Sequence, residues 1–223
     1  FGHRPSRLSQ LCGPPTFLMA AQGVLSEVRQ IGSKSDLIAC GAAISACSKG
    51  KRWDHALHLL SDMQRCVLSP DIIAYNATMS ACARGRQWSR ALVILQTMKV
   101  NQLRPDVVSY GSAINACERG QQWAEALRLL GQFCEGSLQP NAIVFSAAIS
   151  ACEKSEQWAQ ALELLQKMEA ESVEANVVTY NATISACGRG QQWAATFYIF
   201  SELERRLMRP NVITYSAAIS ACE

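Results

Sequence analysis

The residues best suited to recognising a ligand form a series of small or polar side chains that recurs every 35 residues. Its members are Gly41, Asn76, Gly111, Ser146, Asn181 and Ser216. Glycine in a helix costs about 0.5–1 kcal/mol relative to alanine, and Asn and Ser are also weak helix formers. A scaffold alone would favour alanine at all six positions. The variation therefore predicts a surface that touches something different at each step, with tolerated exposure to solvent as the alternative.

A second series in the same register contains only aspartate and asparagine: Asp36, Asp71, Asp106, Asn141, Asn176 and Asn211. Both residue types are good N-caps, so helix capping is the simplest explanation. The two differ chemically, because an ionised Asp only accepts hydrogen bonds whereas Asn donates and accepts them. A row that varies between them could discriminate between hydrogen-bonding partners.

A third series is basic and consists of Lys49, Arg84, Arg119, Lys154 and Arg189. The net charge is only +3, so positive charge is concentrated at one place per repeat. A cation at the end of a helix complements the helix dipole, worth about 0.3–1 kcal/mol, which is one explanation. A regular stripe of cations is also what a polyanion with a regular repeat would meet. Together, the three series indicate single-stranded nucleic acid as the partner.

These series must be positioned by one structural unit that repeats along the chain. All the tryptophans lie 35 residues apart, at Trp53, Trp88, Trp123, Trp158 and Trp193. The same interval separates Cys47, Cys82, Cys117, Cys152, Cys187 and Cys222. The run from Val177 to Cys187 follows a capping residue and predicts one helix. The run from Gln157 to Met168 has apolar residues spaced by three and four, which predicts a second helix.

A two-helix unit of this size cannot bury its own apolar face, so neighbouring units must stack to form a continuous core. The pattern therefore predicts an all-α fold, an α-solenoid of stacked helix-turn-helix units. We expect each first helix to end at a left-handed residue, supplied by glycine in most units. These residues are Gly50, Gly85, Gly120 and Gly190, and Ser155 departs from the pattern.

Composition excludes several other classes of protein and site. No apolar stretch approaches the ~20 residues that a membrane span needs. The chain has ten cysteines but no C-x-x-C pair, and stacked helices ~8–10 Å apart place the repeated cysteines too far apart for disulfides. We expect buried free thiols and hence a reducing intracellular compartment. His55 and His58, three residues apart, form a weak candidate zinc pair. We expect no cofactor and no catalysis, since no nucleophile with a base and no phosphate loop is present.

The unit resembles the pentatricopeptide repeat, a 35-residue helical hairpin whose family binds single-stranded RNA. The stretch from Pro105 to Leu130, PDVVSYGSAINACERGQQWAEALRLL, carries the resemblance in its Pro-Asp opening, its glycine after a basic residue and its ALRLL second helix. The resemblance covers Asp36 to Glu223 and implies a right-handed superhelix. It also implies that each unit contacts one base through the variable first-helix residue and the Asp or Asn that closes the unit.

The implied base-reading pairs are Gly41 with Asp71, Asn76 with Asp106, Gly111 with Asn141, Ser146 with Asn176, and Asn181 with Asn211. By the family's correspondence, a small residue with Asp resembles a guanine reader and a small residue with Asn an adenine reader. Asn with Asp favours uracil, and Asn with Asn favours cytosine with some uracil. The implied target core is 5′-GUAAC-3′, with U as the alternative last base.

Six apolar residues are similar to those that sandwich bases between successive units in the family: Ile38, Ile73, Val108, Ile143, Val178 and Ile213. Packing in the core is the competing interpretation. The five cations would contact phosphates. If each neutralises about one phosphate, binding should weaken with salt at a log–log slope of roughly −3.5.

The expected organisation is a degenerate N-terminal repeat or cap at 1–36, followed by repeats at 37–71, 72–106, 107–141, 142–176 and 177–211. Residues 212–223 would form the first helix of a truncated sixth repeat, so we expect a fragment of a longer array. One alternative function is a protein-interaction scaffold, and another is the RNA-targeting part of an enzyme whose catalytic domain lies outside this chain. The resemblance also implies a mitochondrial or chloroplast role in RNA processing, editing, stability or translation, in which protein partners could join.

Overall fold

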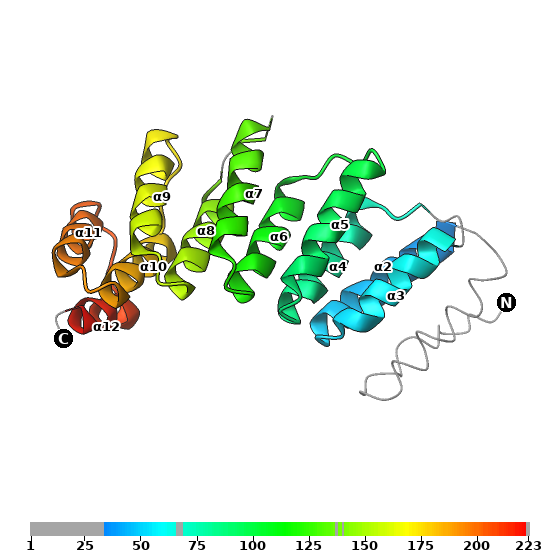
Figure 1. Cartoon of the computed structure of the whole chain (residues 1–223), viewed down its shortest axis with the longest axis horizontal. Coiled ribbons are helices and arrows are strands. Elements are labelled where there is room, and N and C mark those ends of the chain that lie inside the picture. The colour runs from blue at the N-terminus through cyan, green and yellow to red at the C-terminus, as the bar shows by residue number, and fades with distance from the viewer. Residues whose placement is uncertain (1–33, 66–68, 137, 140, 222–223) are drawn as a thin grey trace, which may run out of the picture.

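The computed structural model describes residues 34–65, 69–136, 138–139 and 141–221, and in that part of the chain it contains eleven α-helices and no strand. The helices form a row of antiparallel pairs that runs from one end of the molecule to the other (Figure 1). The predicted all-α solenoid is confirmed. The predicted cap at 1–36 lies almost entirely outside the described residues.

Each pair consists of a first and a second helix. The first helices are α2 (Lys34–Lys49), α4 (Ile72–Arg84), α6 (Val107–Arg119), α8 (Ala142–Lys154), α10 (Val177–Arg189) and α12 (Val212–Ser220). The second helices are α3 (Trp53–Arg65), α5 (Trp88–Val100), α7 (Trp123–Glu135), α9 (Trp158–Ala170) and α11 (Trp193–Arg205). Every second helix in this set therefore begins at one of the repeated tryptophans.

The Asp and Asn series caps five of the first helices, as the sequence predicts. In α6, for example, the Asp106 side chain accepts a hydrogen bond from the Ser109 amide at 2.8 Å. The equivalent bond from the Thr214 amide to Asn211 in α12 measures 3.1 Å. The exception is α2, which begins at Lys34 and includes Asp36, so that Asp36 is not its N-cap.

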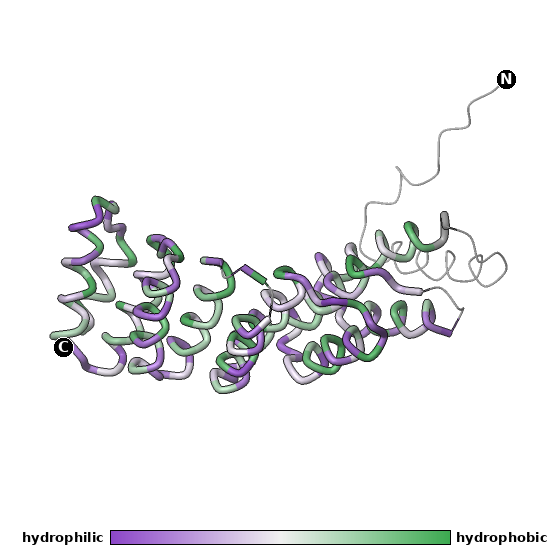
Figure 2. Tube along the Cα trace, turned by 90° about the horizontal axis from the view of Figure 1, so that it is seen from above, coloured by the Kyte–Doolittle hydropathy of each residue, from purple (hydrophilic) through white to green (hydrophobic). Residues whose placement is uncertain are grey.

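Stacking of the pairs builds one continuous core. Each first helix packs on the first helix of the next pair and on the second helices of its own and the preceding pair. Among the described residues, the backbones of successive second helices lie farther apart, and these helices meet through long side chains, as where Lys99 of α5 donates to Gln132 of α7 at 3.3 Å. The first helices thus form the closely stacked inner row. Hydrophobic and hydrophilic residues alternate along the helices (Figure 2), and the core is filled by residues such as Ile114, Phe133 and Ile149.

The glycines at the ends of the first helices have a different role from the one predicted. Gly85, Gly120 and Gly190 have φ values of −85°, −87° and −79°, which any residue can adopt. The left-handed residue is the following one, such as Gln121 with φ 56°. The prediction of a left-handed glycine was therefore wrong.

At three of these positions the glycine lies in close contact with the tryptophan of the preceding pair. A Cβ at Gly85, Gly120 or Gly190 would collide with the indole of Trp53, Trp88 or Trp158, respectively. At the equivalent place in α8, Ser155 is accommodated and its hydroxyl donates to the Gln121 carbonyl at 3.2 Å. Each of these glycines and the tryptophan that it faces therefore form a packing contact between successive pairs.

The repeated cysteines are buried free thiols, as predicted, at Cys47, Cys82, Cys117, Cys152 and Cys187. Burial raises the pKa of Cys117 and Cys152 to about 12. These thiols are protonated at neutral pH and behave as small hydrophobic side chains. Cys222 lies outside the described residues.

Candidate nucleic-acid interface

The variable residues occupy equivalent places in successive first helices, in the second turn of α4, α6, α8 and α10. We call the series Gly41, Asn76, Gly111, Ser146 and Asn181 the reading row. Most of its members are half-buried, whereas Asn181 is 8% exposed. Ser216, the next member of the series, is exposed on α12. The reading row therefore follows the inner row of helices, one position per pair.

The six apolar residues next to the reading row are all exposed. We call them the apolar row: Ile38, Ile73, Val108, Ile143, Val178 and Ile213. Their exposed fractions range from 58% at Val108 to 74% at Ile38. Core packing, the competing interpretation of this series, is therefore excluded. Isoleucine and valine repeated on one exposed line of a helical array form an apolar surface available to a ligand.

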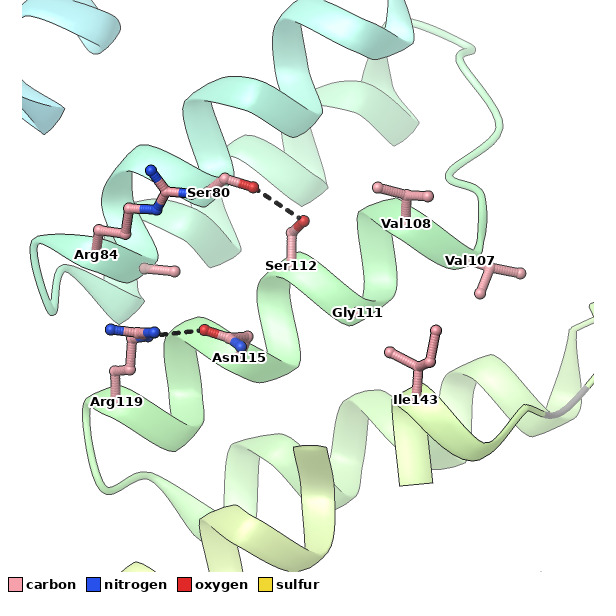
Figure 3. A pocket seen from close by; sticks show the side chains of 10 residues that line it. Ser80, Arg84, Val107, Val108, Gly111, Ser112, Asn115, Arg119 and Ile143 are labelled. Atoms are coloured by element: carbon pink, nitrogen blue, oxygen red, sulfur yellow. Dashed lines mark hydrogen bonds between the residues drawn. The ribbon is translucent and has the colours of Figure 1, made fainter. Parts of the chain in front are cut away.

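A depression of about 420 Å³ brings members of the different rows together around α6. Val108 and Ile143, from successive first helices, lie on either side of Gly111, and Arg84 and Arg119 lie at the other end of the depression (Figure 3). The space above Gly111 is open, because a Cβ there would meet nothing within 4 Å. A flat group of moderate size could lie between the two apolar side chains with a phosphate near the arginines.

Two of the five predicted reading pairs are joined by a direct hydrogen bond. Asn76 Nδ2 donates to Asp106 Oδ1 at 3.2 Å, and Asn181 Nδ2 donates to Asn211 Oδ1 at 3.3 Å. Gly41 and Gly111 have no side chain that could make such a bond. Ser146 instead shares a hydrogen bond of 2.7 Å with Thr179 of the next pair.

Capping fixes which atom of the Asp or Asn side chain remains for a ligand. In every case Oδ1 accepts the backbone amide of the third helix residue, as with Val144 on Asn141 at 3.0 Å and Thr179 on Asn176 at 3.0 Å. The second terminal atom makes no hydrogen bond within the described residues. That atom is Oδ2, an acceptor, in Asp71 and Asp106, and Nδ2, a donor, in Asn141, Asn176 and Asn211.

Asp106 is held in its ionised form by its neighbours. Burial by itself would raise the pKa of this carboxyl group. Hydrogen bonds donated by Ser109 and Asn76 outweigh burial and hold the pKa below the ordinary value. Oδ2 of Asp106 is therefore an acceptor only at neutral pH.

The five predicted phosphate contacts form the cation row: Lys49, Arg84, Arg119, Lys154 and Arg189. All five side chains are exposed. Two of them are paired with an acid of the preceding helix pair: Lys154 with Glu118 at 2.5 Å, and Arg189 with Glu153 at 3.3 Å. Arg84 donates to the Ser48 carbonyl at 2.9 Å, and Arg119 to Asn115 of its own helix at 2.9 Å.

The spacing of the cation row does not reveal the two acids, although each directly precedes a cation of the row. Glu118 precedes Arg119 and Glu153 precedes Lys154, and each reaches the cation of the next pair. The positive charge of the row is therefore uneven. Arg84 and Arg119, which both lie beside the depression, have no acidic partner among the described residues, so their charge is less compensated than that of Lys154 and Arg189.

Other kinds of site find little support in the described part of the chain. No group of three or more His, Cys, Asp or Glu side chains that could hold a metal ion occurs there, and His55 contacts Asp54 at 3.0 Å. None of the described helices has the length and apolarity needed to cross a membrane.

Comparison with protein families identifies the repeat. A family model described as a pentatricopeptide repeat domain matches residues 23–85, 58–119, 93–155 and 163–223. A second model, described as a PPR repeat, matches residues 143–173. A search of curated proteins finds none that matches the chain in sequence.

Solved structures share the fold. The pentatricopeptide repeat protein PPR10 in complex with an 18-nt psaJ RNA element superposes with a TM-score of 0.77 and 19% identity, over 93% of this chain and 30% of PPR10. The pentatricopeptide repeat protein PPR10 from maize gives a TM-score of 0.69 and 22% identity, over 92% of this chain and 29% of that one. The PPR domain of Arabidopsis thaliana protein-only RNase P 1 in complex with tRNA gives a TM-score of 0.68 and 15% identity, over 80% of this chain and 94% of that domain. This chain therefore spans about 30% of the length of PPR10.

Proposed function

We propose that this chain, which belongs to the pentatricopeptide repeat family, binds single-stranded RNA in a sequence-specific manner, with one base to each helix pair. The observation that carries the proposal is the free second atom of each closing Asp or Asn. Its chemistry varies along a row of exposed and half-buried residues while the scaffold around it stays constant. The RNA complexes of PPR10 and of the RNase P domain are consistent with this function on the same fold.

The free atom distinguishes bases by their hydrogen-bonding edges. Guanine and uracil carry a ring N–H at the centre of the Watson–Crick edge, and an Asp Oδ2 can accept it. Adenine and cytosine carry an unprotonated ring nitrogen there, and an Asn Nδ2 can donate to it. Unpaired bases are recognised through this edge in single-stranded RNA. Asp71 and Asp106 therefore favour guanine or uracil, and Asn141, Asn176 and Asn211 favour adenine or cytosine.

The reading row supplies the second distinction, between purines and pyrimidines. Asn76 and Asn181 extend toward the closing residue and leave room for a small ring. Gly41, Gly111 and Ser146 leave more space, which suits a purine. Combined with the closing residues, the five pairs give 5′-GUAAC-3′ as the target core, with U as the alternative last base.

The apolar row and the cation row complete the proposed binding mode. A base between Val108 and Ile143 would bury exposed apolar surface on both of its faces, and stacking of this kind contributes about 1–3 kcal/mol per base in aromatic examples. Lys49, Arg84, Arg119, Lys154 and Arg189 would lie along the phosphates. We place the target among mitochondrial or chloroplast transcripts, because the family resemblance implies it, and assign no catalytic step to this chain.

A binding titration tests the proposal. The chain is titrated with an RNA centred on GUAAC, with a scrambled RNA of the same composition and with the matching DNA. We expect the GUAAC RNA to bind most tightly, and Asn76→Ser to move the preference at the second base from U toward G. Equal binding of all three ligands, or no binding at low salt, would exclude sequence-specific RNA recognition.

A further inference from the structure

The third residue of the first helix varies between pairs in a way that capping and core packing do not require. It is Ala74 in α4, Ser109 in α6, Val144 in α8, Thr179 in α10 and Thr214 in α12. All five side chains are buried. A buried hydroxyl without a partner is costly, so each Ser or Thr here must have a bonding partner.

The residue type follows the reading row of the preceding pair. Glycine at 41 and at 111 is matched by apolar Ala74 and Val144. The polar members of the row, Asn76, Ser146 and Asn181, are matched in order by Ser109, Thr179 and Thr214. The match holds in all five cases that the described chain offers.

The structure shows the contact behind this match. The Ser109 hydroxyl lies 2.7 Å from Asn76 Oδ1, the Thr214 hydroxyl 2.6 Å from Asn181 Oδ1, and the Thr179 hydroxyl 2.7 Å from the Ser146 hydroxyl. Each contact crosses from one pair to the next. Where the reading residue is glycine, no side chain is present to form this bond, and the third residue of the next first helix is apolar.

Helix capping alone does not account for these hydroxyls. Ser109 and Thr214 do complete capping boxes with Asp106 and Asn211. Thr179 completes no such box, yet it still bonds Ser146. Asp71 and Asn141 also cap their helices, although the third helix residues there, Ala74 and Val144, have no hydroxyl group. All three hydroxyls also lie within hydrogen-bond distance of the capping Oδ1, at 2.8–3.1 Å. A polar reading residue distinguishes their units from those of Ala74 and Val144.

We propose that Ser109, Thr179 and Thr214 are positioning residues that fix the orientation of the reading side chain before RNA binds. This inference rests on the proposed function. A hydroxyl that donates to Asn76 Oδ1 turns Asn76 Nδ2 toward Asp106, at 3.2 Å, and the same geometry holds for Asn181. The remaining Nδ2 proton is then a donor of fixed direction for the base. Base choice therefore depends on three residues in these units and not on the reading pair alone.

Transplanting the contact into the third unit tests the proposal by gain of function. Gly111→Asn creates the same reading pair with Asn141 that Asn181 makes with Asn211, and the open space at Gly111 admits the side chain. The variant is compared with Gly111→Asn/Val144→Thr, in which the added hydroxyl is close in shape to the valine it replaces. Both are titrated with GUAAC and GUCAC RNAs. We expect the preference for C at the third base to be roughly threefold to tenfold stronger in the double variant than in the single variant. This difference corresponds to one hydrogen bond.

Removing the contact from the fifth unit tests it by loss of function. Thr214→Val is expected to reduce discrimination between C and the other bases at the fifth position by a similar factor. The control is Thr78→Val, which removes an equally buried hydroxyl that bonds only the Ala74 carbonyl at 2.8 Å. It should leave discrimination at the fifth base unchanged. Without RNA, the Asn181 side-chain amide should give sharp NMR signals in the wild type and broadened ones in Thr214→Val.

The outcomes separate this inference from the proposed function. If the wild type discriminates between bases but Thr214→Val matches it and the two Gly111→Asn variants behave alike, the positioning role is wrong and RNA recognition stands. If the wild type shows no base preference, the proposed function fails and the positioning role fails with it.

Discussion

Gly111 lies within α6 and Gly120 is the C-cap of the same helix, and a methyl group added to each would meet opposite surroundings. At Gly120 it would collide with the Trp88 indole of the preceding pair. At Gly111 it would meet nothing within 4 Å. One glycine packs closely against the preceding pair, and the other leaves open a place on the proposed ligand-facing surface.

The difference shows how one repeated unit separates stability from recognition. The contacts of Trp53, Trp88 and Trp158 with the following Gly85, Gly120 and Gly190 hold successive pairs together and stay nearly constant. The reading row varies, and the buried third residue of the next first helix varies with it. Substitutions at the first kind of position should change stability, and substitutions at the second should change which RNA is bound.

The largest expected effect comes from exchanging these two glycines for alanine. Gly120→Ala forces Trp88 or the backbone to shift, and overpacking of this kind costs about 1–3 kcal/mol. Gly111→Ala should instead stabilise the helix by about 0.5–1 kcal/mol. Urea unfolding monitored by circular dichroism measures both. Equal shifts of the two midpoints would show that the packing contact does not distinguish them.

A smaller effect is expected from the cation row, where salt dependence is the sensitive measurement. Arg119→Gln removes a cation without an acidic partner among the described residues, so the log–log salt slope of RNA binding should become shallower by about 0.7. Lys154→Gln removes a cation that Glu118 already compensates and should change the slope less. Its effect on stability should stay within about 1 kcal/mol, as for other exposed ion pairs. Equal changes in slope would mean that Lys154 leaves Glu118 when RNA binds.

The smallest effect on binding is expected at the buried cysteines. Burial raises the pKa of Cys117 and Cys152 to about 12, so at pH 8 these thiols are protonated and should resist a thiol reagent until the chain unfolds. Their raised pKa contributes stability below the ordinary thiol pKa of about 8.5, and this contribution is lost as the pH rises toward 12. Thiol titration with and without urea measures how far folding protects the thiols. RNA titration of the treated protein then measures the effect on binding. Rapid labelling of Cys117 in the folded protein would contradict the buried state.

The sequence was sufficient to predict the helical pairs, their stacking and the capping role of the Asp and Asn series. Strict spacing carries this information, because each apolar position recurs in the same packing environment. The role of Gly120 could not be predicted, since it depends on a contact with Trp88 of another helix pair. The pairing of Lys154 with Glu118 and of Ser109 with Asn76 also crosses between pairs. Patterns within one unit do not show which residues of two stacked units meet.

The second and fifth units test most directly whether the free atom of the closing residue selects the base. Both have an Asn reading residue held by a hydroxyl, and they differ chiefly in Asp106 and Asn211. Asp106→Asn should keep the helix cap, because Asn211 caps its helix in the same way.

The decisive measurement is the titration of Asp106→Asn and of Asn211→Asp with RNAs that differ at one base. Asp106→Asn should reverse the preference from GUAAC to GCAAC, and Asn211→Asp should shift it from GUAAC to GUAAU, each by roughly fivefold or more, as for a single base contact. Unchanged preferences in two stably folded variants would contradict the account.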